Sequence, residues 1–258
     1  MMLSDRVAIV TGGAHGMGRS TAQRFADEGC SVAVVDILAD EANKTAAKVS
    51  EKGGEALAIQ CDITDSGQVQ NMVEKVISKF GKVDILVNTA GLAGPAKSID
   101  EYSQEEWERV LAVNLSGPFL CSKYVVPHMK KREYGRIINF SSVAAIYPKA
   151  PRISYGAAKA GLIGLTLHMA VDLAAYNILV NVILPGPVRT EFFDNDISPG
   201  ADKDEFFKKI GQNIPIGRVG APEEVAGVAL FLASSLSSYV TGAQICAGVG
   251  EPFRRFQR

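Results

Sequence analysis

The stretch RVAIVTGGAHGMG, residues 6–18, joins a short apolar run to a glycine-rich turn. Its run VAIV has the continuous apolar character of a strand that is buried on both faces of a parallel sheet. Gly12, Gly16 and Gly18 allow a tight turn, close approach of the backbone to a phosphate, and close packing of the next helix on the strand. That helix would offer free N–H groups to an anion at its amino terminus. Such turns also occur for packing alone, but a strand before and a helix after favour a dinucleotide site.

The rest of the chain repeats this alternation of apolar runs and amphipathic segments. STAQRFADEG (20–29) and GQVQNMVEKVISKFG (67–81) carry apolar residues at three- and four-residue spacing and end in glycine, as helices do. The alternation predicts an α/β fold with a doubly wound parallel sheet and helices on both faces. No linker interrupts the chain, so we expect one domain over residues 1–258, with residues 247–258 as an atypical tail. The six candidate strands are RVAIVTG (6–12), SVAVVDI (31–37), EALAIQCD (55–62), VDILVNTA (83–90), GRIINFSS (135–142) and NILVNVILPG (177–186).

Charge and composition exclude several classes of protein. The formal net charge of −1 gives no reason to expect nucleic acid or an anionic membrane as a partner. We find no apolar run of membrane-spanning length and no signal-peptide pattern at the start. The four cysteines are scattered, without metal-ligand spacing, so we expect no metal site. They are interpreted as small buried side chains of a cytoplasmic protein.

Asp36 stands at the end of the second candidate strand, where it can act on a nucleotide ribose. The simpler interpretation is an amino-terminal cap of the next helix. The functional one is a carboxylate that accepts hydrogen bonds from the ribose hydroxyls and repels a phosphate attached there. No basic residue follows immediately, and His15 adds only a partial positive charge near neutral pH. The sequence therefore favours NAD(H) over NADP(H).

Further motifs resemble those of one known family. The turn TGGAHGMG is followed by Asp62 in CDITD, by NTAG (88–91), by Asn114 before a glycine, by Ser142 thirteen residues before Tyr155, by the YxxxK pair Tyr155 and Lys159, and by PGPVRT (185–190). Together, over about residues 4–246, these resemble the short-chain dehydrogenase/reductase family in its common cytosolic subtype. One segment departs from the family pattern, because AGVG (247–250) stands where relatives usually have VDGG.

The resemblance implies a Rossmann-type sheet of about seven strands in the order 3-2-1-4-5-6-7. It assigns catalysis to Asn114, Ser142, Tyr155 and Lys159. In this family the asparagine holds a water that connects the lysine to solvent, and the lysine also binds the nicotinamide ribose. The implied cofactor-binding residues are Gly12, His15, Gly16, Met17, Gly18, Asp36, Ile37, Asp62, Ile63, Asn88, Ala90, Gly91, Tyr155, Lys159, Pro185, Gly186, Val188 and Thr190.

Tyr155 and Lys159 are four residues apart and share one helix face, so they can approach each other. A phenol is a poor base near neutral pH, because its pKa is near 10. An ammonium about 4 Å away favours phenolate by on the order of 4 kcal/mol at an effective dielectric near 20. We therefore expect Lys159 to lower the pKa of Tyr155 by roughly three units. Ser142, at the end of a strand, can bond the substrate oxygen; Ser141 is the alternative, which the spacing to Tyr155 disfavours.

The substrate site is less well defined by the sequence. Its candidates are Ser142, Tyr155, Arg152, Gly186 and Phe192. Lys149 and Arg152 raise the hypothesis of an anionic substrate group, against the alternative that they are solvated loop charges. Residues 190–207, TEFFDNDISPGADKDEFF, form a long polar and aromatic insertion that we interpret as a lid over the cofactor and call the lid segment.

These inferences predict an NAD(H)-dependent oxidoreductase that interconverts a small-molecule secondary alcohol and a ketone, with Tyr155 as general acid/base. One alternative is an NADPH-linked reductase of 3-oxoacyl thioesters. The other is a catalytically silent redox sensor or scaffold, which typically lacks the tyrosine or the lysine. The segment AKAGLIGLTLHMAVDLAA (158–175) is apolar on nearly every face, which predicts a covering subunit in a homodimer or homotetramer.

Overall fold

The computed structural model describes residues 1–148, 151–197 and 200–248. Seven parallel strands form one sheet in the order β3-β2-β1-β4-β5-β6-β7, which confirms the expected order. The sheet reverses direction of winding between β1 and β4, the position at which doubly wound folds bind ligands. The strands are β1 (Val7–Thr11), β2 (Ser31–Asp36), β3 (Ala56–Gln60), β4 (Ile85–Asn88), β5 (Gly135–Phe140), β6 (Ile178–Pro185) and β7 (Gln244–Ala247).

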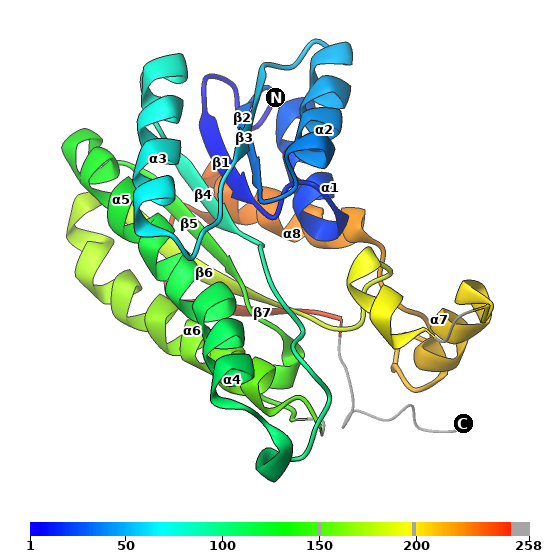
Figure 1. Cartoon of the computed structure of the whole chain (residues 1–258). Helices are drawn as coiled ribbons and strands as arrows, with labels where there is room; N and C mark the ends of the chain where they lie inside the picture. Colours follow the sequence, from blue (N-terminus) through cyan, green and yellow to red (C-terminus); the bar gives the residue numbers. More distant parts are fainter. Residues whose placement is uncertain (149–150, 198–199, 249–258) are drawn as a thin grey trace.

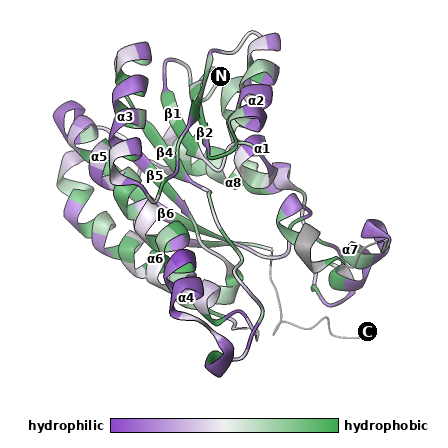
Figure 2. Ribbon diagram, viewed as in Figure 1, coloured by the Kyte–Doolittle hydropathy of each residue, from purple (hydrophilic) through white to green (hydrophobic). Residues whose placement is uncertain are grey.

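Helices cover both faces of the sheet (Figure 1). One layer holds α1, α2 and α8, and the other holds α3, α5 and α6. Each layer packs an apolar cluster against the buried strands, and Figure 2 shows hydrophobic residues along the strands and hydrophilic residues concentrated on the helices around them. The helices are α1 (Gly16–Asp27), α2 (Ala39–Glu51), α3 (Ser66–Phe80), α4 (Gln104–Leu111), α5 (Gly117–Arg132), α6 (Ile153–Leu173), α7 (Lys203–Gln212) and α8 (Pro222–Ala233).

Local sequence signals set the ends of α3. The Asp65 carboxylate accepts hydrogen bonds from the backbone N–H groups of Gly67 and Gln68, which are otherwise without helical partners. Gly81 ends the helix with φ +77°, a left-handed conformation that glycine adopts without steric cost. The predicted glycine stop is therefore confirmed, and the chain turns directly toward β4.

A single π-helical turn, Ala112–Ser116, joins α4 to α5. Such turns hold one extra residue in a helix and often occur at functional sites. Here the turn contains Asn114, whose side chain is fully buried. The lid segment contributes a 3-10 helix at Glu191–Asp196 and the start of α7, and it projects from the sheet in Figure 1.

Two expectations are wrong: that all four cysteines are buried, and that no apolar segment is long enough to span a membrane. Cys30, Cys61 and Cys121 are buried, but Cys246 is exposed because it lies on the edge strand β7. The α6 helix and the turn after it are long and apolar enough to cross a membrane by length and composition. However, α6 packs against β6 and holds the buried Lys159, as expected of a core helix in a folded domain.

Candidate active site

The glycine turn after β1 fits closely under β4. A Cβ on Gly12 would lie 2.7 Å from the backbone of Ala90, and a Cβ on Gly18 would lie 2.1 Å from the carbonyl oxygen of Gly12. Gly12 also has φ +65°, which disfavours other residues. The turn therefore presents bare backbone, with the amino terminus of α1 directly behind it.

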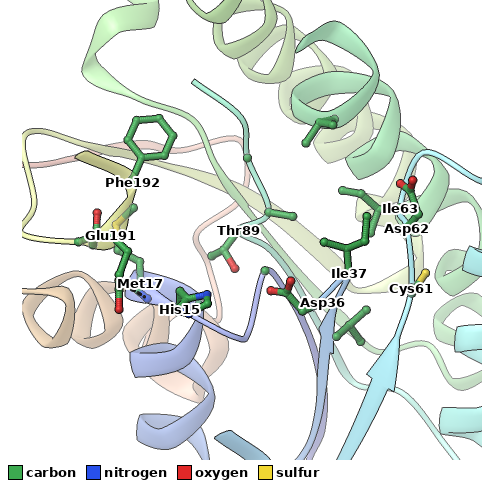
Figure 3. Close-up of a pocket in the computed structure, with 18 residues that line it drawn as sticks. His15, Met17, Asp36, Ile37, Cys61, Asp62, Ile63, Thr89, Glu191 and Phe192 are labelled. Carbon is green, nitrogen blue, oxygen red and sulfur yellow. Dashed lines mark hydrogen bonds between the residues drawn. The ribbon is translucent and has the colours of Figure 1, made fainter. Parts of the chain in front are cut away.

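A cleft of about 380 Å³ lies over this turn, at the carboxyl ends of β1 to β4 (Figure 3). Twelve of the predicted cofactor residues line it, together with Phe192, which was predicted to contact substrate. The twelve are Gly12, His15, Gly16, Met17, Gly18, Asp36, Ile37, Asp62, Ile63, Ala90, Gly91 and Thr190.

Asp36 is held rigidly at one end of the cleft. One carboxylate oxygen accepts a hydrogen bond from the N–H of Ala14 at 3.1 Å, and the other accepts one from the N–H of Leu38 at 3.1 Å. Asp36 is therefore compatible with both interpretations, a helix cap and a ribose-binding carboxylate. It orders the glycine turn and the start of α2, and it still faces the cleft. His15 lies 3.9 Å from the carboxylate of Glu41, which offsets its partial positive charge.

Asp62 lies farther along the cleft and is also ordered by its surroundings. Its carboxylate accepts hydrogen bonds from the backbone N–H and the hydroxyl of Thr64, at 2.9 and 2.7 Å. Ile63 beside it is buried against Gly117, where a Cβ would approach within 2.5 Å. This end of the cleft combines apolar walls with a fixed carboxylate, which suits a flat polar ring such as adenine.

Six predicted cofactor residues lie outside the cleft lining: Asn88, Tyr155, Lys159, Pro185, Gly186 and Val188. Asn88 is buried in the sheet and donates a hydrogen bond to the side chain of Asn139 at 2.8 Å. Pro185 ends β6, the N–H of Gly186 donates to the carbonyl of Ala247 at 2.9 Å, and Val188 is buried. Asn88, Pro185, Gly186 and Val188 therefore contribute to the fold around the cleft and not to its lining, and the side-chain oxygen of Asn88 is buried without a hydrogen-bond partner among the described residues.

Five residues that line the cleft were not predicted as cofactor contacts: Val35, Cys61, Thr89, Val113 and Glu191. Each is adjacent in sequence to a residue that the motifs predict. Including the neighbours of each motif residue would therefore have found all five. Glu191 carries the most chemistry of the five. Its carboxylate reaches the start of α1, a contact across 175 residues that no local pattern indicates.

Lys159 lies on α6, and its buried side chain reaches the end of β5. Its ammonium donates a hydrogen bond to the carbonyl oxygen of Phe140 at 2.8 Å, and its own carbonyl accepts one from the Ser141 hydroxyl at 2.8 Å. Burial lowers the pKa of Lys159 to about 7. The Ser141 hydroxyl is thus used inside the fold, which leaves Ser142 to face the reaction.

The expected lowering of the Tyr155 pKa is wrong for this arrangement. Burial raises the pKa of the phenol, because a phenolate is poorly solvated there. A hydrogen bond with Ser142 and the positive charge of Arg152 oppose that rise. The Lys159 ammonium lies 5.7 Å from the centre of the Tyr155 ring and is directed to Phe140. Tyr155 is therefore a protonated acid near neutral pH.

Asn114 lies beside this pair. Its amide nitrogen donates to the carbonyls of Leu92 and Val110 at 2.8 and 2.9 Å, and its oxygen accepts from the N–H of Leu92 at 3.3 Å. A Cβ on Gly91 would lie 3.1 Å from the Asn114 oxygen and 3.6 Å from the Lys159 nitrogen. The absence of a side chain at Gly91 thus brings the cleft, Asn114 and Lys159 together.

The predicted substrate residues gather around Tyr155, with one exception. The Phe192 ring lies 5.8 Å from the Tyr155 ring, and the Ser142 hydroxyl also accepts a hydrogen bond from the N–H of Ala144. Arg152 immediately precedes α6 and donates to the carbonyl of Gly94 at 3.4 Å. Gly186 instead packs on Gly248, the second residue of the atypical AGVG segment. Lys149, and residues 249 and 250 of that segment, lie outside the described residues.

The cleft fits a dinucleotide. Its bare glycine backbone and the start of α1 can accept a diphosphate, and the N–H of Gly16 already donates to an anion, the Glu191 carboxylate, at 3.1 Å. Asp36 stands where a ribose can bond it, and Gly91 connects the cleft to Asn114 and Lys159. In the described part of the chain, no group of three or more His, Cys, Asp or Glu residues is placed to hold a metal ion.

Comparisons with known proteins agree with this geometry. The family model described as enoyl-(acyl carrier protein) reductase matches residues 12–250. The 3-oxoacyl-(acyl-carrier-protein) reductase of Thermotoga maritima is 39% identical over 245 residues, which cover 95% of this chain and 97% of the relative.

Two solved structures of dehydrogenases are similar over almost the full chain. NAD+-bound xylitol dehydrogenase has a TM-score of 0.90 at 34% identity, covering 97% of this chain and 100% of the other. A 7α-hydroxysteroid dehydrogenase in complex with NADH and 7-oxo glycochenodeoxycholic acid has a TM-score of 0.89 at 38% identity, covering 96% of each chain. The chain therefore belongs to the short-chain dehydrogenase/reductase family of oxidoreductases.

Proposed function

We propose that the protein is an NAD(H)-dependent oxidoreductase that interconverts a secondary alcohol and a ketone. The observation that carries this proposal is the convergence of Tyr155, Ser142, Lys159 and Asn114 beside a cleft that Asp36 lines and that adjoins Asn114 and Lys159 at Gly91. When bound, the nicotinamide ring supplies or accepts the hydride. The chain's own residues then have to orient the substrate oxygen and move one proton.

Tyr155 is placed to exchange that proton. Its raised pKa keeps the phenol protonated, so it can donate to the oxygen of a ketone as the hydride arrives. The Ser142 hydroxyl bonds the same oxygen and stabilises the charge that develops there. In the reverse direction Tyr155 must release its proton first, and Lys159, whose pKa of about 7 allows both charge states, is the adjacent group. The Asn114 oxygen can accept a second hydrogen bond and thereby hold a relay water.

NADH is preferred over NADPH in this proposal because of Asp36. Its carboxylate is fixed by two backbone N–H groups, so it cannot turn away from a phosphate on the adenosine ribose. His15 offers little compensation, because it lies beside Glu41. The NAD+ and NADH in the two solved relatives support the same choice.

The substrate is proposed to be apolar near its reacting carbon. Phe192 contacts the Tyr155 ring, while Ile146 and Ile153, which flank the Ser142 and Tyr155 elements in sequence, leave 40% and 38% of their surfaces exposed. Apolar surface beside an acid/base group suits a ring system or an aromatic group. Arg152 lies beside this surface, where its side chain donates to the carbonyl of Gly94.

A reductase of 3-oxoacyl thioesters is the second candidate, favoured by the Thermotoga maritima relative. It would use the same catalytic residues, with NADPH in place of NADH. Turnover of a 3-oxoacyl thioester with NADPH, exceeding turnover of cyclic ketones with NADH, would select this candidate.

Tyr155→Phe tests the proposed chemistry. The variant keeps the ring packed on Phe192 but lacks the proton, so turnover should fall by about 10²- to 10⁴-fold. NADH binding, measured by fluorescence, should stay close to that of the wild type, because Tyr155 does not line the cleft. Turnover that survives this change would falsify the role of Tyr155.

We also propose a homodimer or homotetramer. Trp107 on α4, Phe119 on α5, and Leu167 and Val171 on α6 all have exposed side chains, and Val171 leaves 82% of its surface accessible. These helices lie on one side of the molecule in Figure 1, where a second copy can cover them. Sedimentation at micromolar concentration should show an oligomer; a monomer would contradict the proposal.

A further inference from the structure

The start of α1 is not capped by the side chain that precedes it in the sequence. His15 occupies the position before the helix and makes no side-chain bond to it. Instead, one Glu191 oxygen accepts a hydrogen bond from the N–H of Gly16 at 3.1 Å, and the other accepts one from the Arg19 guanidinium at 2.8 Å. A carboxylate from the lid segment thus caps the phosphate-binding helix (Figure 3).

Close packing holds this contact in place. Gly16 has φ +49°, and a Cβ there would lie 3.1 Å from the methyl group of Thr190. The glycine therefore lets the chain before Glu191 lie directly on the turn. Partial burial acts to raise the pKa of Glu191, but hydrogen bonding to its own backbone and the charge of Arg19 keep that pKa below its usual value. The side chain is an anion at neutral pH.

Two anions cannot share the start of one helix at low cost. The unpaired N–H groups and the dipole of α1 favour a single negative group, and like charges at short distance repel each other. Glu191 lines the same cleft that fits the dinucleotide. We propose that Glu191 is an intramolecular competitor of the cofactor diphosphate, and that it must leave the N–H of Gly16 before the cofactor can bind fully. This inference rests on the proposed use of a nicotinamide dinucleotide.

The competition also links cofactor binding to the substrate side. Glu191 is followed by Phe192, whose ring contacts Tyr155. Moving the carboxylate away from α1 removes one contact that holds the start of the lid segment, which also carries the aromatic side chain beside Tyr155.

Glu191→Gln tests the competition, because glutamine keeps the size of the side chain and removes its charge. Glu205→Gln is the matched control: it removes the same charge from the lid segment, but Glu205 pairs with Lys209 on α7 and does not line the cleft. The probes are NADH, ADP and adenosine, with affinities measured by NADH fluorescence and by displacement of NADH. Glu191→Gln should bind NADH and ADP about tenfold more tightly than wild type, whereas adenosine, which has no phosphate, should bind equally to both. Glu205→Gln should bind all three probes like wild type.

Several results would overturn the inference. One is an NADH or ADP affinity of Glu191→Gln that equals or falls below that of Glu205→Gln. Another is an equal gain for adenosine, since this would show a general opening of the cleft. If wild type and Glu191→Gln bind neither NADH nor NADPH, the proposed function fails and the inference fails with it. If both bind NADH equally well, only the inference fails.

Discussion

The start of α6 lies beside the cleft that the lid segment lines, and the two regions are held in different ways. Lys159 on α6 and Ser141 at the end of β5 are almost fully buried, and each donates a hydrogen bond to a main-chain carbonyl of the other element or its flank. The lid segment is held by ion pairs between exposed side chains, such as Arg19 with Glu191 and Arg189 with Asp204. Buried bonds to backbone fix geometry, whereas exposed pairs contribute little stability and exchange readily with water. Lys159 and its neighbours are therefore held in place, whereas the lid segment can be displaced more easily.

The largest expected effect concerns the buried ammonium of Lys159. Its pKa is about 7 in the folded chain against an ordinary value of 10.5, so between these values the unfolded chain binds more protons. Wild-type stability should therefore rise with pH across this window, and the cost of burying the charge is present in full below pH 7. Lys159→Met removes this cost. Relative to wild type, the variant should be more stable at pH 6 than at pH 9.5 by on the order of 3 kcal/mol.

Chemical denaturation at the two pH values measures this difference. The bond to the Phe140 carbonyl is lost in the variant at both pH values, and any part of its strength that depends on the charge of Lys159 is already contained in the pKa of that group. Lys48→Met, at an exposed position on α2, is the control and should show no such dependence. An equal dependence in both variants would mean that the charge of Lys159 is not desolvated.

A medium effect is expected for Ser141→Ala. The variant loses a buried hydrogen bond to the Lys159 carbonyl, which should lower the free energy of unfolding by about 1 kcal/mol. Ser50→Ala, at an exposed position, should change it by less than about 0.5 kcal/mol. Urea unfolding of both variants measures the contrast. A loss no greater than that of the control would show that the buried bond does not hold α6 on β5.

The smallest effect on stability is expected for the ion pair that joins Arg189 to the lid segment. Arg189→Gln breaks an exposed ion pair with Asp204 and a contact of the guanidinium with the Phe207 ring at 5.3 Å. Together these should contribute less than about 1 kcal/mol to unfolding. The same urea experiment measures it, and high salt should reduce the difference from wild type further. A loss larger than that of Ser141→Ala would reverse the contrast between the two regions.

Features set by local sequence were predictable. The glycines of the first turn, the apolar strands and the Gly81 stop depend on neighbours within a few residues, and their positions agree with the structure. The catalytic residues were placed by resemblance to a family, because nothing local connects Asn114 to Lys159.

Features that depend on the assembled fold were missed. The contact of Glu191 with Gly16 joins residues far apart in the chain, and a carboxylate after PGPVRT has no local signature. The pKa of Tyr155 was predicted in the wrong direction, because helix spacing indicates that Lys159 can approach but not that its ammonium bonds the Phe140 carbonyl. Burial then dominates over the charge of the lysine.

The π-helical turn at Ala112–Ser116 makes the chain intolerant of a change in length at this point. An α-helix advances by about 100° per residue, so the extra residue sets the angular position of Asn114 relative to α4 and α5. Deleting one residue here would restore regular helical hydrogen bonding and leave the helix axis nearly unchanged. It would also rotate the amide of Asn114 away from Leu92 and Gly91. In this part of the chain, a deletion that improves the regularity of the helix would remove the group that connects Lys159 to the cleft.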